Sequence, residues 1–333
     1  MMRNEKNNRL IEKIKRELGK TALDALHDDN VIEIMLNTDG KLWKESFGTP
    51  MEEIGTISES NAKALLGTIA SYLDTTITAN NPIIECELPI DGSRFEGLLS
   101  PVVSLPSFTI RKKASKVFTL EEYEEQGVFN TLNYDYCNTD NFIPDNLSKK
   151  EIIKYAVKHK KNILLVGSTG SGKTTLANAI IHEISTVAPN DRLVIIEDTA
   201  EIQCSSANKM ILKSNVLISL ERLLEVTLRL RPDRILVGEV RYGSAALALL
   251  KAWNTGHPGG AATIHADSAY LGLRRLESII SEVTANPQPD LIAEAVDLVI
   301  FITKTKSGRV VPEIIEVRGY DPLKKDFIIK KFN

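Results

Sequence analysis

LLVGSTGSGKTTLANAI, residues 164–180, is the strongest structural signal in this chain. It starts within an apolar run, passes through GSTGSGKT at residues 167–174, and continues with the periodicity of an amphipathic helix. The glycine-rich part matches G-x-x-x-x-G-K-[ST] in the strand-to-helix context that a P-loop requires. A chance match in a chain of this length has a probability on the order of one per cent. The sequence therefore predicts a nucleotide-binding α/β domain.

The residues of this loop are expected to make different contacts with a nucleotide. The glycines let backbone N–H groups turn inward onto the phosphates, and the following helix adds the positive end of its dipole. Lys173 reaches the β- and γ-phosphates, and the Thr174 hydroxyl binds Mg²⁺. ATP and Mg²⁺ are therefore the expected ligands. The predicted nucleotide-binding residues are Gly167, Ser168, Thr169, Gly170, Ser171, Gly172, Lys173, Thr174 and Thr175.

Two further apolar runs end in acidic residues. RLVIIEDTAE at 192–201 contains Glu197, and RILVGEVR at 234–241 carries Glu239 one residue later than the usual Asp. Ligands in open α/β sheets bind outside the carboxyl ends of the strands, so we expect Glu197 and Glu239 to face the nucleotide. Asp198 and Glu201 either face it as well or only cap the next turn.

These two glutamates are expected to divide the work of hydrolysis. One acid must deprotonate the attacking water, and another must hold Mg²⁺, usually through water. Because Glu is one methylene longer than Asp, Glu239 recovers the reach to the metal's water shell beside Thr174. We therefore expect Glu239 to hold Mg²⁺ and Glu197 to act as the general base. The reverse assignment stays open, since the sequence sets no distance to the γ-phosphate.

Histidine and arginine residues supply further candidates. His265 follows the apolar run AATI and either is a hydrogen-bonded core residue or senses the γ-phosphate; its spacing from His257 is poor for a metal site. Arg94 and Arg111 lie far from the P-loop in sequence. Each is either a surface salt-bridge residue or a cation that neutralises transferring phosphoryl charge when delivered across an interface.

The chain has 333 residues, enough for two domains. Residues 1–136 combine helical stretches with β-rich runs joined at Asp-Gly pairs, 39–40 and 91–92, which predicts a smaller mixed α/β domain. Residues 137–150, rich in Asn, Asp, Ser and Pro, are expected to form a linker. Residues 151–333 alternate apolar strands with helices, which predicts a parallel sheet covered by helices on both faces.

Composition restricts location and partners. A net charge of −3 gives no general attraction to nucleic acid. No apolar run approaches the roughly 18 to 20 residues of a membrane span, so we expect a cytoplasmic protein. The basic amphipathic segment 9–26 either packs on its own domain or lies on an anionic membrane surface. The three cysteines, Cys86, Cys137 and Cys204, form no CxxC pair and are expected to be free thiols.

Four motifs occur in a characteristic order: the P-loop, IIEDTAE at 195–201, RPDRILVGEVR at 231–241 and TGHPGGAATIHADS at 255–268. In this order they resemble the motifs of the secretion and pilus traffic ATPases of the type II and type IV systems. With VIEIMLNTDGKLW at 31–43 and its short length, the chain is most similar to the conjugative-transfer, TrbB-like branch of the type IV secretion ATPases. The four-cysteine zinc module frequent in the type II branch is absent from the sequence.

The resemblance implies a RecA-like P-loop motor domain, an N-terminal domain that covers the nucleotide, and a hexameric ring. It implies that ATP hydrolysis energises type IV secretion or conjugative transfer, through pilus assembly or substrate translocation. Inner-membrane components of the machine are the implied partners, at the inner face of the cell membrane. By motif position, Arg94 and Arg111 correspond to N-terminal arginines that reach the phosphates, and Glu239 to the glutamate of an atypical Walker B strand.

Other functions remain open at this point. A pilus or type II secretion ATPase shares the same motifs. A RecA-like nucleic-acid motor shares the P-loop and the sheet, but it should carry a basic, aromatic-bearing loop for the strand. No such loop is clear in the sequence, so nucleic acid is not indicated as a direct ligand. A nucleotide-gated scaffold with little turnover is disfavoured by the two carboxylates and the candidate arginines.

Overall fold

The structure is a computed structural model, which describes residues 2–114, 119–130 and 142–332. Part of the predicted linker, residues 137–141 with Cys137, therefore lies outside the described residues. Cys86 and Cys204 are both free thiols.

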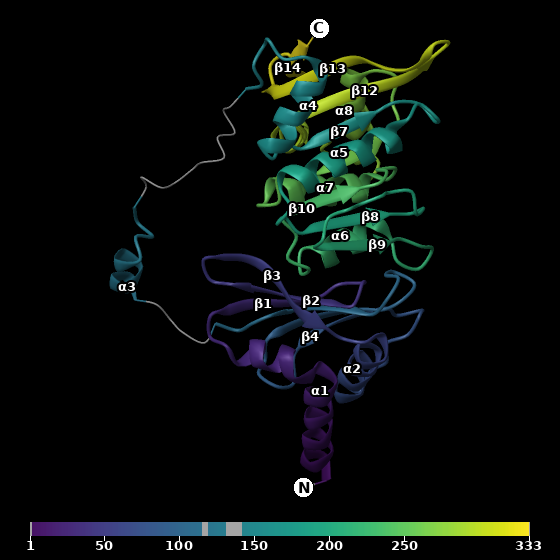
Figure 1. Cartoon of the computed structure of the whole chain (residues 1–333). Helices are drawn as coiled ribbons and strands as arrows, with labels where there is room; N and C mark the ends of the chain where they lie inside the picture. The colour runs from purple at the N-terminus through teal and green to yellow at the C-terminus, as the bar shows by residue number, and fades with distance from the viewer. Residues whose placement is uncertain (1, 115–118, 131–141, 333) are drawn as a thin grey trace. The chain divides into compact units, whose positions relative to one another are not determined.

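The chain divides into two compact units (Figure 1). The N-terminal unit comprises Met1–Ser100 and Leu105–Phe142. The C-terminal unit comprises Pro101–Ser104 and Ile143–Asn333. The short segment at 101–104 belongs to the C-terminal unit because it packs there; the backbone N–H of Lys213 donates a 2.8 Å hydrogen bond to the carbonyl of Val102.

The N-terminal unit contains a six-stranded antiparallel sheet in the order β3-β2-β1-β6-β5-β4. Its elements are α1 (Met2–His27), β1 (Val31–Leu36), β2 (Lys41–Ser46), β3 (Thr49–Thr56), α2 (Glu59–Tyr72), β4 (Ile83–Glu87), β5 (Arg94–Leu98), β6 (Ser107–Arg111) and α3 (Leu120–Glu125). Both predicted hairpins are confirmed, because β1 pairs with β2 and β4 with β5 in antiparallel register. A mixed α/β domain thus precedes the P-loop.

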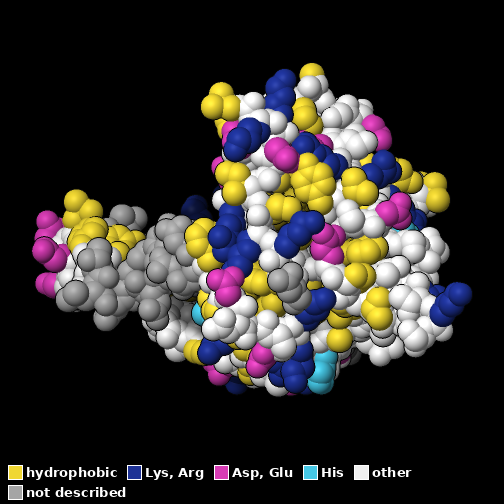
Figure 2. Space-filling model, turned by 90° about the horizontal axis from the view of Figure 1, so that it is seen from above, with side chains coloured by type: hydrophobic (Ala, Val, Ile, Leu, Met, Phe, Trp, Pro, Cys, Tyr) yellow, Lys and Arg dark blue, Asp and Glu magenta, His cyan; other side chains and the backbone are white. Residues whose placement is uncertain are grey.

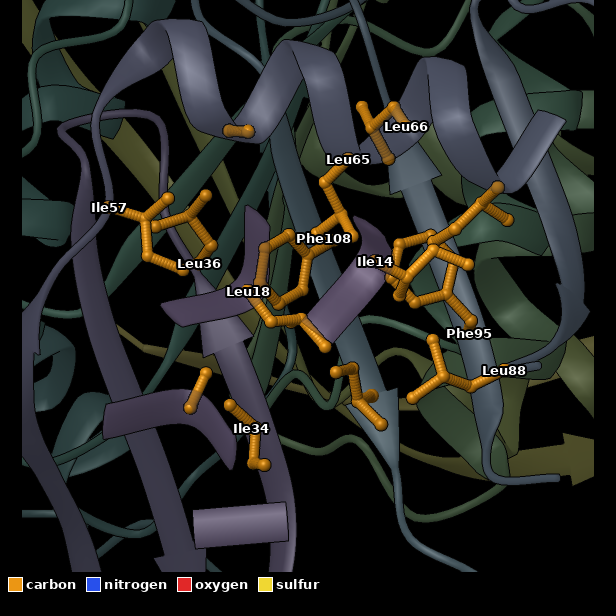
Figure 3. Close-up of a cluster of buried hydrophobic side chains, with 14 of the residues drawn as sticks. Ile14, Leu18, Ile34, Leu36, Ile57, Leu65, Leu66, Leu88, Phe95 and Phe108 are labelled. Carbon is orange, nitrogen blue, oxygen red and sulfur yellow. The ribbon is translucent and has the colours of Figure 1, made fainter. Parts of the chain in front are cut away.

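The core of the N-terminal unit lies between the sheet and helices α1 and α2, as Figure 3 shows for Ile14, Leu18, Leu65 and Phe108. Ile14 and Leu18 are four residues apart in α1, so they share one helix face, and both are buried. The helix bends at Gly19, whose φ of 78° is outside the helical range. The apolar face of the basic helix therefore packs on its own domain. Contact of its basic face with a membrane stays a prediction.

The C-terminal unit contains an eight-stranded sheet in the order β14-β13-β12-β7-β11-β10-β8-β9. Its elements are α4 (Lys149–Lys158), β7 (Ile163–Val166), α5 (Lys173–Val187), β8 (Leu193–Glu197), β9 (Lys209–Lys213), α6 (Leu220–Thr227), β10 (Arg234–Val237), α7 (Gly243–Asn254), β11 (Ala261–Ile264), α8 (Ala269–Ser281), α9 (Pro289–Ala295), β12 (Leu298–Thr305), β13 (Gly308–Asp321) and β14 (Asp326–Phe332). The strands from β12 to β9 in this order run parallel. The predicted α/β class is confirmed.

The sequence pattern predicted a parallel sheet, but two of the strands run antiparallel to their neighbours. β13 pairs with β12 in antiparallel register, and β14 pairs with β13 in the same way. Thr305 pairs with Gly308 across the turn, and so short a connection permits only antiparallel strands. Charged residues are frequent in β13 and β14, so these strands lack the continuous apolar run that marks the central ones.

Helices cover both faces of the central strands (Figure 1). Ile163 and Leu165 of β7 belong to a core cluster that includes residues of α4 and α5. On the opposite face, Gly272 of α8 approaches Val166 so closely that a Cβ at position 272 would lie 2.6 Å from a methyl group of Val166. All four residues of β7 are buried beneath the helices, so a ligand can reach the sheet at the ends of its strands but not on its faces.

Among the described residues, no helix is both long and apolar enough to cross a bilayer. The face presented in Figure 2 carries Lys and Arg side chains that are separated by acidic, hydrophobic and uncharged ones. Charges of both signs are therefore mixed on this face, in agreement with the small net charge of the chain.

Candidate active site

The predicted site residues of the C-terminal unit meet at the carboxyl edge of its sheet. The P-loop follows β7, Glu197 ends β8, and Glu239 and His265 come shortly after β10 and β11. These strands are parallel neighbours, so their carboxyl ends lie along one edge. A cavity of about 300 Å³ opens there. Its lining residues are Thr169, Gly170, Lys173, Thr174, Glu197, Asp198, Thr199, Glu201, Ile202, Gly238, Glu239, Arg241, Thr263 and His265.

The shape of the P-loop depends on its glycines. Gly170 and Gly172 have φ values of +72° and +104°, which other residues rarely adopt. A Cβ on Gly167 would lie 2.3 Å from the carbonyl oxygen of Ile302. Gly172 is also the N-cap of α5 and has no side chain to bond the first N–H groups of the helix. These groups are therefore available to an anion.

Lys173 is held inside the loop. Its Nζ donates hydrogen bonds to the carbonyl oxygens of Gly167 and Ser168, at 2.8 and 3.0 Å, and lies 3.2 Å from Nδ1 of His265. Burial lowers the pKa of Lys173, while the charge of Glu239 acts in the opposite direction. A bound phosphate would give the ammonium group a charged acceptor in place of neutral ones.

His265 connects Lys173 with Glu239. An ammonium group can only donate, so its bond to His265 requires an unprotonated Nδ1. In the neutral ring the proton then lies on Nε2, which is 2.7 Å from Oε1 of Glu239. The His265 side chain is 43% exposed, so it is part of the cavity wall rather than of the core. This chain of contacts joins Lys173 of the P-loop to an acid.

Both carboxylate oxygens of Glu239 are engaged. Oε1 contacts His265, and Oε2 accepts a 2.7 Å hydrogen bond from Arg241, which also lies 2.8 Å from Asp198. Burial by itself raises the pKa of Glu239, but the Arg241 bond and the charges of His265, Arg241 and Lys173 outweigh it, so the pKa lies below its usual value. Arg241 thus links the loops that follow β8 and β10.

Glu197 holds the loop that follows it. Its Oε2 accepts hydrogen bonds from the backbone N–H groups of Glu201 and Ile202, at 2.9 and 3.0 Å, and the residue is only 4% exposed. A Cβ on Gly238 would lie 3.2 Å from Cβ of Glu197, tighter than an ordinary contact. The glycine in the place of the usual Asp therefore leaves room for Glu197 on the neighbouring strand.

Glu201 is a site residue whose role the sequence left undecided. The Thr174 hydroxyl donates a 3.0 Å hydrogen bond to Oε2 of Glu201. Asn178 of α5 secures this loop, since its Nδ2 donates to the Glu201 carbonyl at 3.2 Å and its Oδ1 accepts from the Gln203 N–H at 3.0 Å. The available signal was the position of Glu201 four residues after Glu197, in the same acidic motif.

The residues around Thr174 fit a Mg²⁺ ion. Mg²⁺ prefers oxygen ligands, keeps several waters, and usually takes one or two protein groups together with substrate phosphates. The Thr174 hydroxyl and the Glu201 carboxylate offer such a pair, and Glu197 and Glu239 line the same cavity. The remaining ligands would be substrate phosphates and waters, because within the part of the chain that the structure describes no group of three or more His, Cys, Asp or Glu side chains could hold a metal by itself.

The second histidine of the same motif lies elsewhere. His257 precedes β11, and its Nδ1 is 3.1 Å from the carbonyl oxygen of Pro232, which precedes β10. Both residues therefore belong to the amino edge of the sheet, opposite to the cavity. Burial lowers the pKa of His257, which favours its neutral form. This contact connects two loops of the amino edge.

Arg94 and Arg111 belong to the N-terminal unit, where the structure brings them together. They lie directly opposite each other on β5 and β6. Like charges in this position repel each other. Arg111 has an acidic neighbour, with 3.6 Å between its Nε and Oε1 of Glu33. Both arginines line a cavity of this unit together with Lys112, Lys113 and one acid, Glu87. The cations outnumber the acid, an arrangement that suits an anion.

The family of the chain follows from comparison with known proteins. The model of a family described as type II/IV secretion system protein matches residues 56–309. The chain belongs to this family, as its four ordered motifs predicted.

The similar proteins include members of conjugation and type IV secretion systems. The probable conjugal transfer protein TrbB of Sinorhizobium fredii is 48% identical over 94% of this chain and 91% of that protein. The type IV secretion system protein VirB11 of Bartonella quintana is 30% identical, over 90% of this chain and 91% of that protein. These relatives confirm the predicted conjugative-transfer branch.

A solved structure shows the same fold. The VirB11 ATPase from the type IV secretion system of Brucella suis, in complex with sulphate, matches with a TM-score of 0.82 and 26% identity. The match covers 96% of this chain and 98% of that chain. It confirms the predicted fold class for nearly the whole length.

Proposed function

We propose that this protein is a Mg²⁺-dependent ATPase that powers transport in a conjugal-transfer type IV secretion system. The observation that carries the proposal is that Lys173 and Thr174 line the same cavity as the carboxylates of Glu197, Glu201 and Glu239. A phosphate cradle, an oxygen site for Mg²⁺ and nearby acids are the parts that phosphoryl transfer needs. The names of the similar TrbB and VirB11 proteins support the transport role.

The P-loop residues bind and orient the triphosphate. The N–H groups at the start of α5 donate hydrogen bonds to the phosphate oxygens. Lys173 exchanges its bonds to the carbonyl oxygens of Gly167 and Ser168 for bonds to the terminal phosphates. The Thr174 hydroxyl and the Glu201 carboxylate would hold Mg²⁺, which supplies neutralisation of the phosphate charge. Since Lys173 also contacts His265, its movement toward phosphate releases that histidine and alters its bond to Glu239.

The division of labour among the acids remains a proposal. Oε2 of Glu197 is occupied by two N–H groups of its loop, whereas its Oε1 makes no hydrogen bond among the described residues and can take the proton of a water. This supports Glu197 as the base. Glu239, expected to hold Mg²⁺ through water, has both oxygens engaged by His265 and Arg241. We therefore propose that Glu201 shares the metal role with it.

We also propose that the protein acts as a hexameric ring, in which Arg94 and Arg111 bring positive charge to the phosphates. The repulsion between the two paired arginines supports this role, because an anion would relieve it. Docking of the ring on inner-membrane components, at the cytoplasmic face, is part of the same proposal. The mass of the protein in solution, measured by light scattering with and without ATP, tests the ring.

Substitution of the P-loop lysine tests the activity. Lys173→Ala should abolish phosphate release from ATP without unfolding the protein. The reason is that the ammonium group binds the phosphates of the ligand and is not part of the hydrophobic core. Lys154→Ala removes an equal charge from the exposed side of α4 and should leave the rate unchanged. Full hydrolysis by a folded Lys173→Ala protein would reject the proposed function.

A further inference from the structure

The β12–β13 hairpin stands beside the P-loop. β12 is the parallel neighbour of β7, and its Phe301 pairs with Val166, the last residue of β7. Beyond this pair β7 turns into the P-loop, whereas β12 continues to Thr305. At about 3.3 Å per residue, this extension reaches roughly 13 Å past the end of β7. The hairpin is therefore a wall along one side of the phosphate-binding loop.

Arg309 of this wall lies against the last glycine of the loop. A Cβ on Gly172 would be 2.5 Å from Cδ and 2.9 Å from Nε of Arg309, and 3.5 Å from a methyl group of Ile302. The stem of Arg309 therefore runs across the bare backbone of Gly172. Since Gly172 is the N-cap of α5, the guanidinium group is carried close to the positive end of that helix.

The charges around Arg309 are unbalanced. From Leu298 to Pro312 the sequence contains Lys304, Lys306 and Arg309 but no acidic residue. Arg309 is exposed, and its side chain makes no hydrogen bond or ion pair among the described residues. A cation beside a helix N-terminus and near Lys173 is unfavourable unless an anion joins them. The arrangement therefore favours a negatively charged ligand that extends beyond the P-loop.

The order of the strands indicates which end of a nucleotide Arg309 meets. β7 lies between β12 and β11, and the strands that carry the acids, β8 and β10, lie beyond β11. The cavity with Lys173 and Thr174 is on that acidic side, and Arg309 is not part of its lining. A nucleotide with its γ-phosphate at Lys173 then leads its nucleoside away from the carboxylates, toward the β12–β13 hairpin.

We propose that Arg309 is a nucleotide-binding residue whose planar guanidinium stacks on the base of the bound nucleotide. A guanidinium group stacks well on aromatic faces, and its stem is already laid flat on Gly172. The proposal rests on the proposed ATPase function, because it assumes that the P-loop holds the phosphates. It adds a contact at the nucleoside end, which the P-loop motif does not provide.

Calorimetric titration of the full chain with ATP and with inorganic tripolyphosphate tests this proposal. Tripolyphosphate has the phosphates but no base. We expect Arg309→Ala to weaken ATP binding about tenfold and to leave tripolyphosphate binding unchanged. Arg309→Lys keeps the charge but loses the plane, so it should behave like Arg309→Ala. Lys324→Ala removes an equal charge from the exposed turn between β13 and β14; it is the control and should bind both ligands normally.

Two results would overturn the proposal. Unchanged ATP affinity in both Arg309 variants would show that the residue does not contact the nucleotide. An equal loss for tripolyphosphate, restored by Arg309→Lys, would show a charge contact with phosphate instead of stacking. Lys173→Ala separates this inference from the proposed function, because it should weaken both ligands; if it weakens neither, the phosphate site itself is wrong.

Discussion

The hydroxyl of Thr174 donates a hydrogen bond to the carboxylate of Glu201, with 3.0 Å between Oγ1 and Oε2. The bond joins the first turn of α5 to the loop after β8 and brings an acid to the hydroxyl that a P-loop uses for Mg²⁺. On the proposed function Mg²⁺ binds beside Thr174, and Glu201 then either yields this bond or joins the water shell of the ion. In both cases the affinity for Mg²⁺ depends on Glu201.

We therefore expect Glu201→Gln to raise the Mg²⁺ concentration for half-maximal ATP hydrolysis by about tenfold, as changes in the outer shell of metal sites commonly do. Titration of the rate with Mg²⁺ at saturating ATP measures this effect. Glu282→Gln, an exposed residue at the end of α8, is the control. If Glu239→Gln shifts the Mg²⁺ dependence and Glu201→Gln does not, the metal role belongs to Glu239 alone.

Two substitutions at Glu197 should distinguish its role in holding the loop after β8 from its proposed role as the general base. Glu197→Gln keeps an oxygen for the N–H groups of Glu201 and Ile202 but loses the basic carboxylate. We expect it to bind ATP normally and to hydrolyse it at least 100-fold more slowly, the usual contribution of a general base. Glu197→Ala should also weaken nucleotide binding, because the loop is released. Normal turnover in Glu197→Gln would show that Glu197 acts only as a support.

The low pKa of Glu239 predicts a pH-dependent contribution to stability. A carboxyl group whose pKa is lowered by folding stabilises the protein above its unfolded-state value, near 4.5, and this stabilisation is lost as the pH falls through the folded-state value. Glu239→Gln should therefore lower the free energy of unfolding by about 1–2 kcal/mol at pH 7 and by less at pH 3. Urea unfolding at both pH values measures the difference. An equal loss at both would mean that the ionised form is not favoured by folding.

The approach of α7 to α8 predicts a position that tolerates no side chain. A Cβ on Gly243 would lie 1.9 Å from the carbonyl oxygen of Ile279, a backbone atom that cannot move alone. Gly243→Ala should destabilise the protein by about 1–3 kcal/mol in thermal or urea unfolding. Gly67→Ala is the matched control in helix α2, with no atom within 4 Å of its new Cβ. It should be neutral or stabilising by up to about 1 kcal/mol, and a similar loss in both variants would contradict the steric explanation.

Sequence patterns alone predicted the P-loop, the central strands and helices, and the strands that carry Glu197 and Glu239. These features depend on local patterns: glycines at fixed spacing, apolar runs and helical periodicity. The parallel neighbourhood of the strands follows from the same alternation, so the meeting of both glutamates and His265 at one edge could also be predicted. The roles of these acids in hydrolysis could not, and they stay predictions.

Contacts between side chains depend instead on how the whole unit folds. His257 and His265 stand in one motif, yet β11 carries them to opposite edges of the sheet, because a strand separates its ends. Glu201 reaches Thr174 across 27 positions of the chain because Glu197 folds its loop back. Arg309 lies on Gly172 because β12 is placed beside β7 rather than beside β11. Strand order comes from the packing of the whole unit, and no local pattern of residues specifies it.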